Sequence, residues 1–474
     1  MPPLPAPPPA APAALPAASE PSLPPTPPAA DAGQPLPIDL PTALRLAGSN
    51  PLDIAVAAER VRVAGAQLDR ANVLWVPTLN LGVDYFRHDG RLQDIVGTVF
   101  TTSKSAILFG AGPQAVVPTA DAWYVPLAAR QVARARQAEV IAARNDSTLA
   151  VAEAYFNVQQ ARGEVAGAAE ATRRAAELVR RAEQLAPGLV PTVEVNRAKA
   201  ELARRKQAVE AAYERWQTAS ADLTRLLRLE PGTVVEPAEP PHLRVPLIDP
   251  AATVGDLMPV ALTRRPELAA NQAVIQAALA RVKQEKARPF LPVLAVRGVG
   301  SNTPGLAGGA FGGGVNDDVS NFGGRFSVNI QAVWEFQNLG LGNRALVRER
   351  EAENRVALLE LLRTQDRVAA EVTQALAQVR RATARVTAAE DGLRDAVESA
   401  DKNLQGLGQT KRAGEQLLLV IRPQEAVAAV TALDQAYRDF YAAVGDANRA
   451  HFRLYRALGH PADCLPQAVG TPSQ

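Results

Sequence analysis

Hydrophobic and polar residues alternate with a period of two between Gly324 and Phe336. The even positions carry Phe326, Val328, Ile330, Ala332, Trp334 and Phe336, and most odd positions are polar. Because side chains on a strand point to opposite faces in turn, this stretch is expected to be a strand with one apolar face. About 12 residues reach ~40 Å, enough to cross a hydrocarbon layer of about 30 Å at a tilt. An edge strand of a soluble sheet gives the same pattern.

Three other segments favour strands, and two of them contain Trp and Tyr residues. The four expected strands lie at about 74–87, 116–127, 290–301 and 324–336, with long loops at 88–114 and 303–324. Strands that cross a membrane carry aromatic side chains where the membrane meets water. The sequence therefore predicts an aromatic belt of Trp75, Tyr85, Trp123, Tyr124, Trp334 and Phe336.

Helical periodicity dominates the rest of the chain. It predicts two helical hairpins, at 128–229 with a turn at 186–188, and at 340–458 with a turn at 412–414 and a last helix from Leu418. Within the long helices a seven-residue seam recurs, as in Val151, Val158 and Val165 with Ala154, Ala161 and Ala168. A strict period of seven requires a partner helix at a shallow angle, and alanine brings the two axes close. Such a thin seam suits a single wall of helices, and an ordinary antiparallel coiled coil would share it.

The same order of elements is written twice along the chain. Pro266 follows Pro51 by 215 positions, and Pro292 follows Pro77 by the same number. The expected organisation is a disordered Pro/Ala-rich tail at 1–36, a first repeat at 37–250, a second repeat at 251–461 and a C-terminal tail at 462–474. Residues 230–250 would form a connector within the first repeat. The fold class is therefore mainly α with a small β part, in two repeats of helix, strand, strand, long helix and helix.

Composition narrows the possible functions of these 474 residues. Lys and Arg number 51 against 49 Asp and Glu, so no strong basic field favours nucleic acid. Cys464 is the single cysteine, which excludes an internal disulfide. No apolar run approaches the ~18 residues of a transmembrane helix, so a membrane-spanning part would have to consist of strands.

No pattern of catalytic or cofactor-binding residues stands out. The four histidines, His88, His242, His451 and His460, are dispersed and lack paired-ligand spacing. The glycines at 308–314 lack the Gly-Lys-Ser/Thr ending of a phosphate loop. We expect no enzyme activity, no metal site and no cofactor.

The segment from Gly188 to Ala198 resembles the Gly-x-x-x-x-x-acid-Val-x-x-Ala tip motif of the TolC-like outer membrane efflux family. The segment from Gly414 to Ile421 follows this motif more loosely, and the resemblance covers about residues 38–461. It implies a homotrimer in which each protomer gives four strands to a twelve-stranded barrel in the outer membrane, continued by a helical barrel in the periplasm. It also implies a passive exit duct for small molecules in an efflux or secretion system. The partners would be outer-membrane lipid, a periplasmic adaptor (membrane fusion) protein and an inner-membrane pump.

The resemblance also implies a gated aperture at the tips of the helical hairpins. The residues expected there are Gly188, Glu194, Arg197, Arg412, Gly414 and Arg422. The best-known family member has aspartates just after its second tip glycine, where this chain has Val420 and Pro423, so an acidic ring is not expected. Residues 1–36 show no recognisable secretory signal.

A soluble helical scaffold is the alternative function, because heptads and missing catalytic motifs would fit it equally well. The four strands and the repeat of 215 residues favour the duct, since a scaffold requires neither. The sequence does not indicate the transported substrate or the class of pump.

Overall fold

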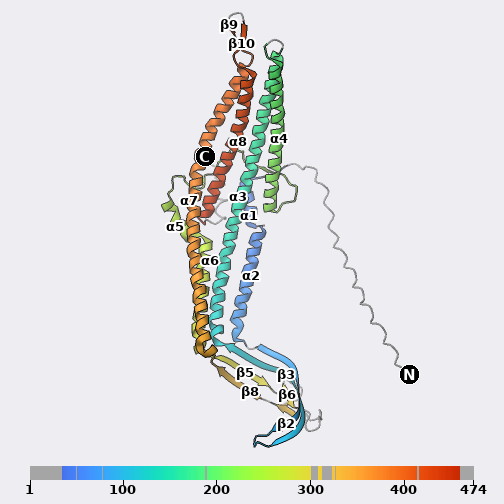
Figure 1. Ribbon diagram of the computed structural model, residues 1–474, viewed down its shortest axis with the longest axis vertical. Helices are drawn as coiled ribbons and strands as arrows, with labels where there is room; N and C mark the ends of the chain where they lie inside the picture. Colours follow the sequence, from blue (N-terminus) through green and yellow to red (C-terminus); the bar gives the residue numbers. More distant parts are fainter. Residues whose placement is uncertain are drawn as a thin grey trace, which may run out of the picture.

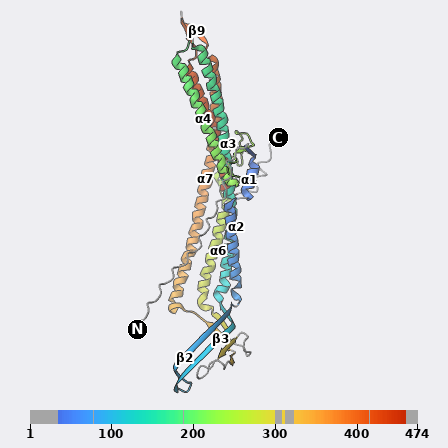
Figure 2. The same cartoon turned by 90° about the vertical axis from the view of Figure 1, so that its right-hand side faces the viewer.

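The computed structural model describes residues 35–49, 51–76, 78–186, 189–299, 308–311, 323–325, 327–413 and 416–459. These residues form a long, narrow column of helices with a β-sheet at one end and helical tips at the other (Figures 1 and 2). Short elements surround the column near its middle, at a level that we call the waist.

The elements follow the chain in two similar series. The first series is β1 (Leu36–Ile38), α1 (Leu40–Ser49), α2 (Leu52–Asn72), η1 (Val73–Trp75), β2 (Thr78–Gln93), β3 (Val99–Pro118), α3 (Thr119–Leu185), α4 (Thr192–Leu227) and β4 (Val235–Pro237). The second is α5 (Val254–Arg264), α6 (Pro266–Ala287), η2 (Arg288–Phe290), β5 (Val293–Val299), β6 (Gly308–Phe311), β7 (Gly323–Arg325), β8 (Ser327–Val333), η3 (Gln337–Gly340), α7 (Leu341–Gly406), β9 (Thr410–Ala413), β10 (Gln416–Leu419) and α8 (Pro423–Ala457).

The large sheet is an antiparallel meander. β2 pairs with β3 along its whole length, and β3 pairs with β5 and, further along, with β6. β8 then pairs with β5, and β7 pairs with β6. Because β5 and β6 lie along the same strand β3, the path across the sheet is β2, β3, β5 with β6, and β8 with β7. In the described residues, β2 and β8 lie at opposite edges.

Two sequence predictions about the first pair of strands were wrong. The strand expected at about 116–127 ends at Pro118, and Thr119 begins α3. Trp123 and Tyr124 therefore lie on a helix, because the chain turns at Pro118 into alanine-rich sequence that favours a helix. The loop expected at 88–114 is mostly strand, since β2 continues to Gln93 and β3 starts at Val99. Its polar residues gave no apolar face, yet the hairpin pairs their backbone groups across the sheet. Part of the loop expected at 303–324 is likewise strand, in β6 and β7.

The helices form a single layer whose membership changes at the waist. Between the waist and the sheet, α2 packs on α3, α3 on α6, and α6 on α7. Between the waist and the tips, α4 packs on α3, α3 on α8, and α8 on α7. α3 and α7 thus run the full length of the column, while α2 and α6 give way to α4 and α8 (Figure 1). None of the helices in the described ranges combines the length and apolar character needed to cross a membrane.

The core is a series of narrow seams, as the heptads predicted. The seam residues of α3, including Val151, Val158 and Ala161, are buried, as are Val372 and Val379 of α7. One large apolar cluster lies at the waist, where α1, β1 and β4 pack on α3 and α4. Stability of the column therefore depends on a continuous line of small contacts.

Two glycines of α3 let α8 approach closely. A side chain at Gly163 would place its Cβ 2.4 Å from the ring of Tyr441, and one at Gly167 would come within 2.6 Å of Tyr437. Tyr437 and Tyr441 stack with ring centroids 6.3 Å apart. The two rings therefore fill notches in α3 that only glycine leaves open.

Hydrogen bonds and ion pairs fix the waist. The hydroxyl of Tyr155 donates to the Glu239 carboxylate, which also accepts from the backbone N–H of Leu40 at 2.8 Å. Burial, followed by the bond to Glu239, raises the pKa of Tyr155 above its usual range. In the second half of the chain, the buried Arg265 binds Glu371 at 2.5 Å. A hydrogen bond from a tyrosine thus fixes the waist in the first repeat, and an ion pair from an arginine fixes it in the second.

Candidate functional site: the helical tips and the junction with the sheet

The first tip is the turn between α3 and α4. The backbone N–H groups of Leu189 and Val190 both donate to the carbonyl oxygen of Leu185, each at 3.1 Å. α4 starts at Thr192, and Glu194 in its first turn binds Arg197 at 2.7 Å. An acid in the first turn is favoured by the free N–H groups of the helix start. The acid of the tip motif is therefore held locally by a neighbour on its own helix.

The second tip differs from the first. α7 ends at Gly406, and the chain forms an antiparallel hairpin of β9 and β10 before α8 starts at Pro423. The helix expected from Leu418 was therefore predicted too long. Pro423 marks the true start, because proline fits the first position of a helix and disfavours helix in the residue before it. Arg422 is the exposed residue directly before α8.

An apolar cluster joins the two tips. Buried side chains near the end of α3 and the start of α4 pack on the end of α7 and the start of α8 (Leu178, Val179, Ala182, Val190, Val195, Ala198, Leu404, Leu407 and Ala426). Gly408, with φ of +97°, brings the second tip over Leu185 of the first. Gly406 is equally constrained, since a Cβ there would lie 2.3 Å from Ile421 Cδ1. The two tips of the protomer therefore share one hydrophobic cluster.

An ion pair and a hydrogen bond connect the two long helices in the tip half. Arg174 of α3 binds Asp401 of α7, and Arg181 of α3 donates to the carbonyl oxygen of Leu404. On α7 these bonds lie within about two turns of the end of the helix. They hold the two long helices together just where the tip begins.

A second ionic cluster joins α4 to α8. Arg205 of α4 donates to Asp434 of α8, which also binds Arg438 at 2.8 Å. Arg205 binds Glu201 at 2.9 Å, and Glu201 accepts from the hydroxyl of Thr431 at 3.1 Å. Asp434 is 1% exposed and Glu201 is 3% exposed, so both carboxylates are held away from water.

The structure brings together part of the predicted tip set. Glu194 and Arg197 form one ion pair, and Arg422 stands at the start of α8. The backbone of Arg412 lies in β9 opposite Leu417. Gly188 and Gly414 lie outside the described residues, as does the side chain of Arg412. The role of these residues at an aperture stays a prediction.

The predicted aromatic belt falls at the junction between helices and sheet. Trp75 in η1, Trp123 in the first turns of α3, and Trp334 and Phe336 after β8 are all exposed there, whereas Tyr124 is half-buried. Tyr85 belongs to β2, and its side chain lies outside the described residues. Phe290 in η2 is a member that sequence reasoning missed. The repeat could have found it, because Phe290 stands where Trp75 stands in the first half.

Charged residues between the hairpins were also missed. Arg205 and Asp434 are 229 positions apart, so no local spacing indicates their contact. No group of His, Cys, Asp and Glu side chains suited to a metal ion occurs among the described residues.

Comparison with known proteins agrees with this architecture. Residues 43–227 and 257–460 match the model of the outer membrane efflux protein family. Among solved structures, the CmeC outer membrane channel of Campylobacter jejuni is 15% identical with a TM-score of 0.71, covering 89% of this chain and 85% of that chain. The outer membrane protein VceC of Vibrio cholerae is 18% identical with a TM-score of 0.69, covering 89% and 96%. The open state of the MtrE outer membrane channel of Neisseria gonorrhoeae is 18% identical with a TM-score of 0.69, covering 89% and 88%. No match was found among curated proteins.

The column of long helices and the small sheet thus define a TolC-like fold. The chain belongs to the outer membrane efflux protein family. The resemblance seen in the sequence is therefore confirmed, and the alternative of a soluble scaffold is set aside. The protein is a trimeric efflux channel of the outer membrane with a periplasmic helical part, and channels of this family are not enzymes.

Proposed function

We propose that three copies of this chain close into one exit duct that receives its substrate from a periplasmic adaptor protein and an inner-membrane pump. Transport through the duct is passive, and the pump supplies the driving force. Residues 37–250 and 251–461 act as two copies of one structural unit, with the tips of their hairpins forming the aperture. The observation that carries the proposal is the open order of elements within the protomer, which leaves an unpaired edge on each side.

The unpaired edges of the sheet support closure of a barrel by pairing between neighbouring protomers. β2 pairs only with β3 and β8 only with β5 among the described strands, so each edge presents free backbone groups. Unpaired strand edges cannot face hydrocarbon, because lipid offers no hydrogen bonds. Pairing β8 of one copy with β2 of the next would satisfy both edges and close a barrel of three protomers.

The edges of the helical layer support the same arrangement. Between the waist and the sheet the outer helices are α2 and α7, and both carry exposed apolar residues (Leu52, Val56, Val63, Val356 and Leu359). Val56 lies 16 residues before the end of α2, and Leu359 lies 18 residues after the start of α7. At about 1.5 Å per residue both are roughly 25 Å from the sheet end of their helices, so they would meet across a joint between copies.

Disulfide trapping tests the joint. In a chain with Cys464 replaced by serine, the double variant Val56→Cys/Leu359→Cys should give covalent dimers and trimers on oxidation. Val56→Cys alone and Leu359→Cys alone serve as controls and should stay monomeric in denaturing gels. A double variant that stays monomeric although the native assembly is trimeric would refute this pairing of edges.

Exposed apolar side chains at the tips support docking of a partner there. Leu189, Val193 and Val420 are exposed beside the apolar cluster of the tips. Such residues on a tip suit a partner that also presents an apolar end. Val193→Asp should abolish export from cells while the purified trimer keeps its conductance in a planar bilayer. The control Ile141→Asp, on an exposed position of α3 far from the tips, should export normally. Normal export by Val193→Asp would remove the docking assignment without affecting the duct.

A further inference from the structure

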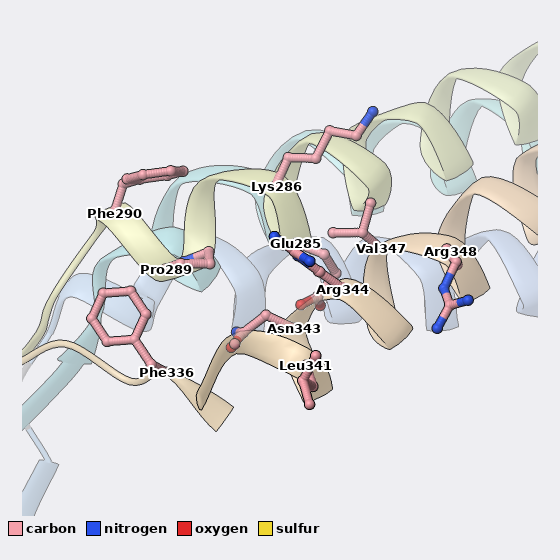
Figure 3. A pocket seen from close by; sticks show the side chains of 11 residues that line it. Glu285, Lys286, Pro289, Phe290, Phe336, Leu341, Asn343, Arg344, Val347 and Arg348 are labelled. Atoms are coloured by element: carbon pink, nitrogen blue, oxygen red, sulfur yellow. The ribbon is translucent and has the colours of Figure 1, made fainter. Parts of the chain in front are cut away.

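A pocket of about 860 Å³ lies where the sheet meets the helices in the second half of the chain (Figure 3). The last turn of α6, η2 and the first turns of α7 enclose it, together with Phe336. β5 starts at Val293, three residues after Phe290, and β8 ends at Val333, three residues before Phe336. The pocket therefore stands at the level where the membrane strands end.

One part of the pocket is apolar. Its lining includes Pro289, Phe290, Phe336, Leu341 and Val347. Phe290 is 78% exposed and Phe336 is 60% exposed, so the protomer itself does not cover these rings. Exposed aromatic rings at the ends of membrane strands are typical of the interface between lipid and water.

The other part of the pocket is cationic. Lys286, Arg344 and Arg348 line it, against the single carboxylate of Glu285. Glu285 is already bound to Arg288 at 2.9 Å, and Lys286 is bound to Glu351 at 2.7 Å. In the part of the chain that the structure describes, no ion pair is found for Arg344 or Arg348. Two arginines thus bring uncompensated positive charge to an apolar pocket.

A buried donor without an acceptor lies beside these arginines. Asn343 is 6% exposed, and its Oδ1 accepts from the backbone N–H of Gln337 at 2.8 Å. Its Nδ2 is buried and has no partner among the described residues. Asn343 also belongs to the first turn of α7, where Gly340 offers no side-chain cap. Unpaired donors at a helix start favour an anion, and Asn343 stands among the side chains that line the pocket (Figure 3).

We propose that this pocket binds an anionic phospholipid from the membrane leaflet that faces the helices, one molecule in each protomer. The phosphate lies between Arg344 and Arg348 and accepts from Asn343. The acyl chains lie on Phe290, Phe336 and the lipid-facing side of the sheet. The inference rests on the proposed insertion of the strands into the membrane and does not depend on the tips. Basic pockets between helices at a membrane surface are suited to anionic lipid headgroups.

Native mass spectrometry of the trimer, stripped of lipid in an uncharged detergent, tests the proposal with phosphatidylglycerol as the probe. The wild-type trimer should retain up to three phosphatidylglycerol molecules, and Arg344→Gln/Arg348→Gln should weaken retention about 30-fold, or about fivefold for each arginine. The control Arg381→Gln/Arg394→Gln removes two exposed charges from the same helix and should retain lipid as the wild type does. Equal retention by both double variants would overturn the proposal.

Two further arms separate the sources of the ligand. Phosphatidylcholine should bind more weakly than phosphatidylglycerol, and inorganic phosphate at the same concentration should not displace the lipid. Displacement by phosphate would mean that the pocket takes a free anion, and equal binding of phosphatidylcholine would mean that charge is not recognised. Either result refutes an anionic-lipid site.

A measurement on the unaltered chain covers the case in which the variant fails to assemble. Hydrogen exchange of backbone amides in residues 336–350 should be slower in nanodiscs of phosphatidylglycerol and phosphatidylcholine than in nanodiscs of phosphatidylcholine alone. Equal exchange in both would overturn the proposal, and equal protection in lipid-free trimers would mean that a second copy fills the pocket. Conductance of Arg344→Gln/Arg348→Gln should stay at the wild-type level, so a failed lipid site and a failed duct give different results.

Discussion

Replacing Asp434 with asparagine should open the channel. The carboxylate of Asp434 lies on the second hairpin and accepts from Arg205 on the first, so this bond ties the hairpins together in the tip half. If widening the aperture separates α4 from α8, the bond exists only in the closed state. Asparagine keeps the shape of the side chain and removes its charge, so the packing of the seam should survive.

The structure sets the size of the effect. Removing one partner of a buried ion pair costs about 3–5 kcal/mol. Arg205 keeps its bond to Glu201, and Arg438 is 40% exposed and can turn to water. We therefore take about 2 kcal/mol as the loss of stability of the closed state. At ~1.4 kcal/mol for each factor of ten, the ratio of closed to open channels should fall about 30-fold.

Single-channel recording in planar bilayers measures that ratio directly. Asp434→Asn should spend far more time open than the wild type, and Arg205→Gln/Asp434→Asn should behave like Asp434→Asn alone, because one bond is lost in both. The control Asp391→Asn, which breaks an exposed pair within α7, should change the ratio less than about threefold. Intact Asp434→Asn trimers with wild-type gating would refute the reasoning, as would fully additive effects of the two substitutions.

Three other predictions concern the packing and titration of the column. Gly406→Val should lower the thermal midpoint of the trimer, because its Cβ would meet Ile421 at 2.3 Å, whereas Gly392→Val, with open space around it, should not; equal midpoints would contradict the clash. Tyr155→Phe should destabilise the waist by about 1.5–3 kcal/mol, the usual worth of a hydrogen bond to a charged group, and an unchanged midpoint would show that the bond contributes nothing. Burial lowers the pKa of His451 below its ordinary 6.5, so near and below that pH the unfolded chain binds more protons than the folded chain, and stability should fall as pH falls. His451→Gln should therefore lose less stability than the wild type between about pH 7.5 and 5.5. Parallel stability profiles of the two proteins would refute this.

Local patterns predicted most of the elements in this fold. The heptads of α3 and α7 and the helix after Pro191 are properties of neighbouring residues. The second tip was beyond such patterns, because a run of leucines before Pro423 fits a helix as well as the hairpin that forms. The end of β3 was missed for a similar reason, since apolar residues on both sides of Pro118 hide the change from strand to helix.

Contacts between distant segments could not be predicted from one sequence. The bond from Arg205 to Asp434 exists because helices from both halves lie side by side, and the unpaired arginines come near Phe290 because α6 and α7 pack together. Charges on helix faces are ordinarily solvated, so the sequence gives no reason to single these out. Only the three-dimensional arrangement distinguishes a buried ion pair between helices from a solvated surface charge.

Tyr437 and Tyr441 of α8, which fill the glycine notches of α3, fix the axial position of α8 along α3. A slip of α8 by one turn would carry one ring into the other ring's notch and drive the second ring against a neighbouring side chain, so the axial position of the second hairpin relative to the first is locked near the waist end of the tip half. Any widening of the mouth must then be a swing or a roll about Gly163 and Gly167, since sliding is blocked. The notches would be the pivot of this movement, and the tips, at the far end of the hairpins, would move the most.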